Sequence, residues 1–247
     1  MTINLIGVDC ATDPRNVGYA FGTFSEHGTV VEQAALGTNA LPPAQAIADW
    51  LDHRSGPTLL ALDAPLGWPD PMAQQLATHH AGEAVTGTAN DLFRRETDRF
   101  IRERIGKQSL DVGADRIART AHAALGLLES LRQSLQQPIT LAWQPAFEGL
   151  GAIEVYPAAT LVAHGIESTG YKAANGQAAR ERVAEALGSR MEVSEPIPTM
   201  ESKSDALDAV ICLLAAQDFL AGKAMPPHDD APVKKEGWIW VRDPVKW

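Results

Sequence analysis

The sequence predicts an α/β domain around a mixed sheet of five strands, and three observations lead to this prediction. Two strongly apolar segments, residues 3–8 and 58–62, have the composition of central strands that are covered on both faces. Segments with helical periodicity separate and follow them. Each apolar segment is followed directly by an aspartate, Asp9 or Asp63, at the edge where open α/β sheets build their sites.

Composition narrows the class of protein. The 247 residues are expected to form one domain, 1–247, and their net charge of −10 argues against non-specific nucleic-acid binding over the whole surface. A local basic groove remains compatible with it. Two cysteines, Cys10 and Cys212, form neither a disulfide framework nor a zinc spacing, so we expect a cytoplasmic protein. The start of the chain lacks the pattern of a signal peptide, and the longest apolar run, residues 209–216, is too short to cross a bilayer. We therefore expect no membrane association.

An antiparallel meander is predicted for the beginning of the chain. Turn-forming residues at 26–28 join the second and third strands as a hairpin. Two prolines at 42–43 then open a helix. The next strand, residues 58–63, follows that helix, so we expect it to lie parallel to the first strand. The three strands of the meander are predicted at residues 3–10, 17–24 and 29–37.

A helical insertion is predicted at about residues 66–150, before the fifth strand. Within it, Asn90 or Asp91 caps a helix that extends past residue 105, and a longer helix follows. The tail at 237–241 either adds a short edge strand or packs across the core. The remaining elements are predicted as a helix at 114–135, the fifth strand at 152–157, and helices at 177–187 and 202–220.

Two carboxylates at neighbouring strand ends imply a cation between them. The side chains of Asp9 and Asp63 are expected to meet at one edge of the sheet. Like charges at close range repel each other, and removal from water adds to the cost. A divalent cation relieves both effects, and ligands that are all oxygen favour Mg²⁺ or Mn²⁺.

Five short motifs stand, in this order, at residues 7–9, 62–69, 95–98, 154–157 and 203–209. Together they resemble the DUF429 family, a predicted nuclease group with a ribonuclease H-like fold, and the resemblance covers nearly the whole chain. It implies a sheet with an antiparallel start, flanked by helices, and acids on the first strand, the fourth strand and the last long helix. For activity it implies metal-dependent hydrolysis of phosphodiesters, which is an analogy from fold.

The resemblance and the chemistry of two-ion catalysis together suggest roles for the acids. Asp9 would bridge two ions and Asp63 would serve one of them, while Glu154 would complete the set or orient a water molecule. Asp205 stands where related nucleases carry their final acid, on the last long helix. Asp208 lies three residues further on the same helix face and is the alternative metal ligand.

A segment rich in arginine is the candidate for substrate binding. Residues 94–119 contain eight basic and five acidic residues, a net charge of +3, and guanidinium groups suit phosphate oxygens. Arg95, Thr97 and Asp98 fall on a motif of the family and are expected at the edge of the site. We also expect Lys203 there; it stands near the place where the family pattern often has a histidine. The alternative is a solvated helix face with ordinary i,i+4 ion pairs.

The predicted function is metal-dependent hydrolysis of phosphodiesters in DNA or RNA, with nucleic acid or a nucleotide as the substrate and Mg²⁺ or Mn²⁺ as the cofactor. One alternative is a phosphotransferase or ATPase of the sugar-kinase and actin type. Those proteins use two such lobes and a glycine-rich phosphate loop, whereas this chain has one lobe and no glycine between Asp9 and Gly18. The second alternative is a non-catalytic module that binds nucleic acid or a nucleotide.

Overall fold

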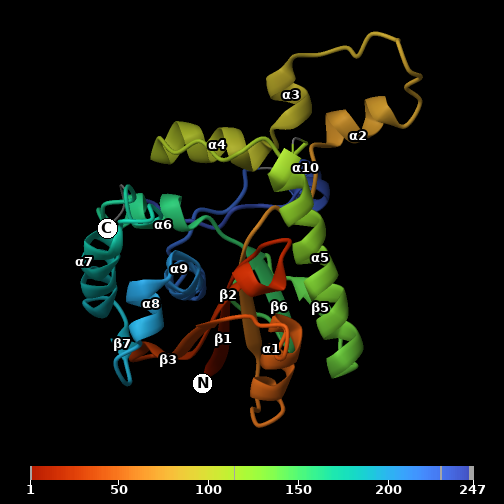
Figure 1. Cartoon of the computed structure of the whole chain (residues 1–247). Helices are drawn as coiled ribbons and strands as arrows, with labels where there is room; N and C mark the ends of the chain where they lie inside the picture. Colours follow the sequence, from red (N-terminus) through yellow and green to blue (C-terminus); the bar gives the residue numbers. More distant parts are fainter. Residues whose placement is uncertain (1, 114, 229, 245–247) are drawn as a thin grey trace.

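A mixed sheet of seven strands lies at the centre of the residues that the structure describes (Figure 1). The computed structural model describes residues 2–113, 115–228 and 230–244. Its strand order is β5-β6-β4-β1-β2-β3-β7, in which β2 runs antiparallel to both of its neighbours and the other pairs are parallel. The strands are β1 (Ile3–Asp9), β2 (Gly18–Ser25), β3 (Gly28–Leu36), β4 (Thr58–Asp63), β5 (Ile139–Leu141), β6 (Leu150–Glu154) and β7 (Glu192–Val193).

The structure confirms the antiparallel meander of β1, β2 and β3 and the parallel pairing of β4 with β1. The predicted count of five strands is wrong, because β5 and β7 extend the sheet at its two edges within the described residues. These strands have only three and two residues. Segments that short show no alternation of apolar and polar residues, so their sequence does not distinguish them from loops.

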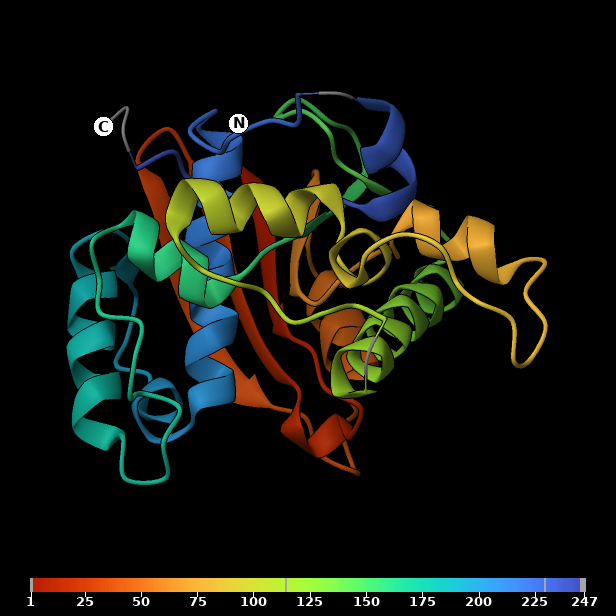
Figure 2. The ribbon, with the colours of Figure 1, turned by 90° about the horizontal axis from the view of Figure 1, so that it is seen from above.

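Helices cover both faces of the sheet (Figures 1 and 2). On one face α9 packs against the first four strands, with α7 and α8 beside it. On the other face lie α1 and α5, which contact each other. None of the helices among the described residues is long and apolar enough to span a membrane. The helices are α1 (Pro43–Leu51), α2 (Asp70–Leu76), α3 (Ala89–Phe93), α4 (Glu96–Ile105), α5 (Asp115–Leu135), α6 (Pro157–Ala163), α7 (Gln177–Gly188), α8 (Pro198–Ser202), α9 (Ser204–Leu220) and α10 (Asp230–Glu236), with a 3₁₀ turn at Pro14–Asn16.

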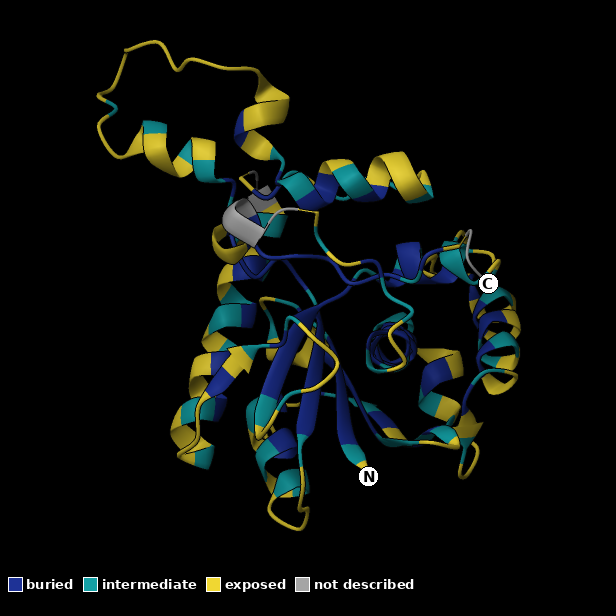
Figure 3. Ribbon diagram, turned by 180° about the vertical axis from the view of Figure 1, so that it is seen from behind, coloured by how far each residue is buried: buried dark blue, intermediate teal, exposed yellow. Residues whose placement is uncertain are grey.

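The region between β4 and β6 differs from its prediction in two respects. The helix expected to begin at Asn90 or Asp91 is divided into α3 and α4, because Arg94 and Arg95 have extended backbone conformations. Thr88 caps α3 instead, since its side chain accepts the backbone N–H of Asp91. The region also contains β5, so it is not purely helical. Its α2–α3 part is largely exposed and projects from the body of the protein (Figure 3).

Alternate residues of the central strands enter different apolar cores. Leu5 of β1 and Leu59 of β4 pack on the α9 side of the sheet, and the next residue of each strand packs on the side of α1 and α5. Asp9 and Asp63 are four residues beyond Leu5 and Leu59. Because side chains alternate between the two faces of a strand, both aspartates point to the α9 side.

Two glycines bring the beginning of α9 close to the sheet. A Cβ atom on Gly7 would lie 2.0 Å from the carbonyl oxygen of Ala209, and one on Gly18 would lie 2.0 Å from that of Asp205. No side chain fits at such distances, so only glycine permits this approach. The first turns of α9 therefore lie directly on β1 and β2, beside Asp9.

The tail passes along β6. Ile239 forms a parallel bridge with Glu154, and the backbone N–H of Trp240 donates to the carbonyl oxygen of Glu154 at 2.9 Å. Trp238 and Trp240 are both buried. The tail thus packs over the core and forms one isolated bridge with β6, without the edge strand that the sequence offered as the other arrangement.

Candidate metal centre

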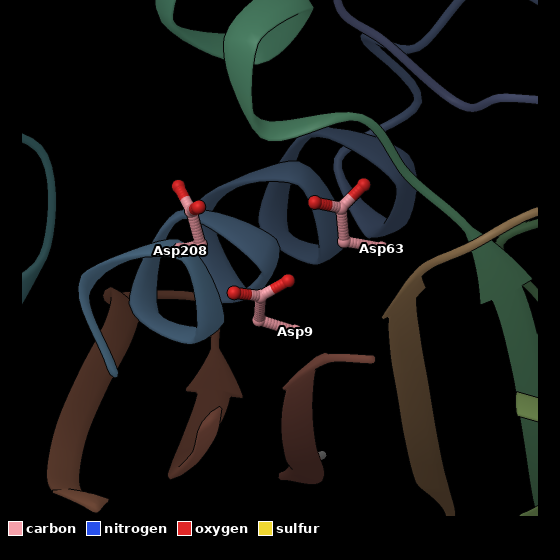
Figure 4. Close-up of side chains that lie close together, drawn as sticks. All are labelled: Asp9, Asp63 and Asp208. Atoms are coloured by element: carbon pink, nitrogen blue, oxygen red, sulfur yellow. The ribbon is translucent and has the colours of Figure 1, made fainter. Parts of the chain in front are cut away.

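Three aspartates converge where β1 and β4 end (Figure 4). Asp9 and Asp63 are partners in the parallel register of these two strands, and Asp208 comes from the first turns of α9. One carboxylate oxygen from each lies within 4.8 Å of the other two. We call Asp9, Asp63 and Asp208 the acidic cluster.

The acidic cluster lies at a pocket of about 540 Å³, which Asp9 and Asp63 line. Asp9 and Asp63 are partly exposed, whereas Asp208 is fully buried behind them. Tyr156 and Ser168 stand among the other residues around the pocket. Solvent can therefore reach Asp9 and Asp63 through this pocket.

Burial and mutual repulsion make these carboxylates hard to ionise. Burial raises the pKa of Asp9 well above its ordinary value, and the charges of Asp208 and Asp63 raise it further. Burial raises the pKa of Asp63 from 3.8 to about 7, although the charge of Lys172 opposes the change. The pKa of Asp208 is also raised, again chiefly by burial. Raised pKa values at three adjacent carboxylates in a pocket are typical of functional sites.

Two residues of the loop between α6 and α7 contact Asp208. The hydroxyl of Tyr171 donates a hydrogen bond to Oδ1 at 2.8 Å, and Nζ of Lys172 lies 2.6 Å from Oδ2. Sequence reasoning missed both residues. Their segment has no periodicity and no known motif, and only the position of a tyrosine and a lysine after Gly170 hinted at a structured turn.

The acidic cluster fits a divalent cation. Its donors are all carboxylate oxygens, which suits hard cations such as Mg²⁺, Mn²⁺ or Ca²⁺. Oδ2 of Asp208 is buried, and its contact with Nζ of Lys172 at 2.6 Å brings one ammonium group to three adjacent carboxylates. One positive charge does not balance three carboxylates, and a coordinated cation would offset the remaining repulsion.

Asp205 and Lys203 lie outside the acidic cluster. Asp205 is in the first turn of α9, partly exposed, and accepts a hydrogen bond from the hydroxyl of Ser204 at 3.2 Å. Its charge contributes to the raised pKa of Asp9, so it is a neighbour of the cluster. Of the two acids that the sequence left open on this helix, Asp208 is the one that joins Asp9 and Asp63. Lys203 is exposed just before the helix.

The side chain of Glu154 is paired with Arg95 and is not a member of the acidic cluster. It pairs in register with Leu62, one residue before Asp63, and the alternation of side chains therefore turns it away from Asp63. Its two oxygens bind the guanidinium of Arg95 at 2.6 and 2.7 Å, and one also accepts the backbone N–H of Leu66 at 2.9 Å. Both side chains are almost completely buried. Glu154 therefore has an internal partner, and it also lines the pocket of the acidic cluster, where its charge contributes to the raised pKa of Asp63.

Arg95, Thr97 and Asp98, expected at the edge of the site, form a buried network, and Arg95 and Asp98 line the same pocket as Asp9 and Asp63. Arg95 and Asp98 are paired with each other, and their side chains are 1% and 0% exposed. The hydroxyl of Thr97 accepts the backbone N–H of Ile239 at 2.8 Å. Arg95 also donates to the carbonyl oxygen of Glu236 at 3.0 Å. The network ties α4 to β6, α10 and the tail, and it borders the pocket of the acidic cluster.

An α/β sheet with acids at the ends of two parallel strands defines a class of protein with a candidate cation site at the edge of its sheet. Within that class, the chain belongs to the DUF429 family, described as a protein of unknown function, whose pattern matches residues 7–231. Comparisons with curated proteins and with solved structures gave no match.

Proposed function

We propose that this protein is a metal-dependent hydrolase of nucleic-acid phosphodiesters, built on a ribonuclease H-like arrangement. The observation that carries the proposal is the convergence of Asp9, Asp63 and Asp208, from two parallel strands and the last long helix, around an oxygen-only site. The antiparallel start of the sheet and the position of α9 on it agree with such an arrangement.

The residues of this chain provide a rigid anionic socket. Asp9 and Asp63 are held on buried strands, and Asp208 is held by the contact of α9 with Gly7 and Gly18. We propose Mg²⁺ or Mn²⁺ as the physiological ion. When bound, a divalent ion supplies positive charge to phosphate oxygens and lowers the pKa of a water molecule that attacks phosphorus. The three aspartates determine the position of the bound ion relative to the pocket.

A second pocket supports a substrate with several phosphates. Arg94, Arg99 and Arg102 line it together with Gln108, in a volume of about 350 Å³. The residues that follow Gln108 in the chain, Ser109 and Leu110, line the pocket of the acidic cluster. One strand of nucleic acid placed across this segment would have a phosphate near each pocket. The arginines would then act as a local basic path on a protein whose net charge is −10.

The experiment is a cleavage assay with fluorescent single-stranded, duplex and branched DNA and RNA, with Mg²⁺, with Mn²⁺ and with excess chelator. We expect cleavage that requires the ion, and a loss of about 100-fold or more in Asp9→Asn. The matched control is Asp49→Asn, on the exposed surface of α1, which should retain full activity.

Wild-type protein that binds no Mn²⁺ at millimolar concentration and cleaves none of these substrates would refute the proposal. Nucleic-acid affinity that is unchanged by Asp9→Asn, without turnover in either protein, would instead identify a binding module. Release of ADP from ATP would point to a phosphotransferase.

A further inference from the structure

Lys172 places an ammonium group against the acidic cluster. Its Nζ atom lies 2.6 Å from Oδ2 of Asp208, whose side chain has no exposed surface, while the lysine side chain itself is 55% exposed. A lysine ammonium group is a cation at neutral pH, and this one lies between the cluster and solvent.

The position of Lys172 is set by contacts on both sides of it. The buried side chain of Arg180 donates to the carbonyl oxygens of Tyr171 at 2.7 Å and Ala173 at 3.3 Å. Tyr171 is itself buried, and its hydroxyl binds the other oxygen of Asp208. The backbone that carries Lys172 is thus anchored to α7 and to the cluster. These contacts hold the ammonium group of Lys172 beside Asp208.

The charges of this site match a single divalent ion. The three carboxylates of the cluster contribute −3 and Lys172 contributes +1, so these four groups carry −2 when all are ionised, and Asp205 is a further, partly exposed acid nearby. One divalent cation neutralises that charge, whereas two would leave a net positive charge in a partly buried place.

We propose that Lys172 supplies the second cation of the site, so that the acidic cluster binds one divalent ion and the ammonium group beside Asp208 stands in place of another. This inference rests on the proposed function and specifies the metal stoichiometry of the same site. Lys172 is then a positioning residue for the ion and for the substrate phosphate that meets it.

The test is a calorimetric titration of Mn²⁺ into the full chain at pH 8, with wild type, Lys172→Met, Lys172→Arg and the control Lys234→Met. Lys234 is exposed on α10. We expect one ion in wild type, Lys172→Arg and Lys234→Met. In Lys172→Met we expect a second ion, or binding of the first that is about tenfold tighter or more, because a positive charge has been removed from beside it. Without metal, Lys172→Met should also unfold at a lower temperature than Lys172→Arg, because three carboxylates then lack a counter-charge.

Each of the other possible results contradicts either the role of Lys172, the proposed metal function, or both. Two ions in wild type, or unchanged stoichiometry and affinity in Lys172→Met, would overturn the role of Lys172 and leave the proposed metal function intact. No uptake in any variant would refute the proposed function itself. Uptake by Lys172→Met alone would show that the lysine excludes metal from the natural protein, which overturns both. If Lys172→Met does not fold, Lys172→Gln and the wild-type stoichiometry provide the same decision.

Discussion

Replacing Asp63 by asparagine should stabilise the metal-free protein at pH 8. The ionised carboxylate of Asp63 is unfavourable in the folded state, since its pKa there is about 7 against an ordinary value of 3.8. At about 1.4 kcal/mol for each pKa unit, this difference corresponds to roughly 4 kcal/mol. Because Asp63 is partly exposed, we expect solvent to reduce the gain to about 2–4 kcal/mol, or roughly 5–15 °C in melting temperature. Asparagine retains the shape of the side chain and removes the charge.

The sign of the pH dependence follows from proton binding. Between about pH 4 and pH 7 the folded protein holds a proton on Asp63 that the unfolded chain has already lost. The folded state therefore binds more protons in this window, so wild-type stability falls as pH rises through it and levels off above. In Asp63→Asn this contribution is absent. The difference in stability between the two proteins should be small near pH 4 and largest above pH 7.

The assay is thermal unfolding from pH 4 to pH 9 in chelator, repeated with Mn²⁺. Excess Mn²⁺ at about 100 times its dissociation constant should stabilise wild type by about 2.7 kcal/mol and should have much less effect on Asp63→Asn. Asp49→Asn controls for the loss of an exposed carboxylate. A stability difference independent of pH, or a variant less stable than wild type at pH 8, would show that Asp63 is not held as an unfavourable charge.

Two further substitutions test the framework of the site. Gly7→Ala should destabilise the protein by about 3 kcal/mol or more and weaken Mn²⁺ binding, because the added Cβ would collide with the backbone of α9. The control is Gly188→Ala, where the added atom meets open space, and it should change stability by less than about 1 kcal/mol. Chemical denaturation and calorimetry measure both, and an equal effect of the two would contradict the close-approach argument. Arg95→Met should cost about 3–5 kcal/mol, because it leaves the buried carboxylate of Glu154 without its partner, whereas Arg119→Met on the exposed face of α5 should cost less than about 0.5 kcal/mol. A small effect of Arg95→Met on stability together with a large loss of substrate affinity would favour the substrate-binding role expected from the sequence.

The sequence predicted those parts of the fold that depend on long, regular patterns. The strands that carry Asp9 and Asp63, their parallel pairing and the last long helix are all present. Such elements have runs of buried residues with a clear period, and their ends are marked by a change in composition. The edge strands, the division of one helix into α3 and α4, and the cap at Thr88 depend on tertiary contacts or on single backbone conformations, which no periodicity reports.

The register of the strands determines which acids meet at the site, and the sequence does not give that register. Asp9, Asp63 and Glu154 each end a predicted strand and carry the same kind of side chain. In the sheet, Asp9 stands opposite Asp63, but Glu154 stands opposite Leu62 and is turned to the other side. A shift of one residue reverses the face on which a side chain lies, and the sequence gives strand ends only to within a few residues. On α9, the family's pattern favoured Asp205 with Asp208 as the alternative, and the structure places Asp208 in the cluster. The loop that brings Lys172 to the cluster has no periodicity from which it could be predicted.

Among the buried acids of the described residues, the group around Glu154 and the acidic cluster differ in how their charges are compensated. Glu154 and Asp98 share Arg95, and every oxygen of Glu154 has a donor within 2.9 Å. Such a group is satisfied by the protein itself and gains nothing from an added ion. The acidic cluster has three carboxylates and one ammonium group beside them. The protein pairs Glu154 completely with its own donors, but it leaves the acidic cluster with a net negative charge. We therefore expect a cation from solution to bind at the cluster.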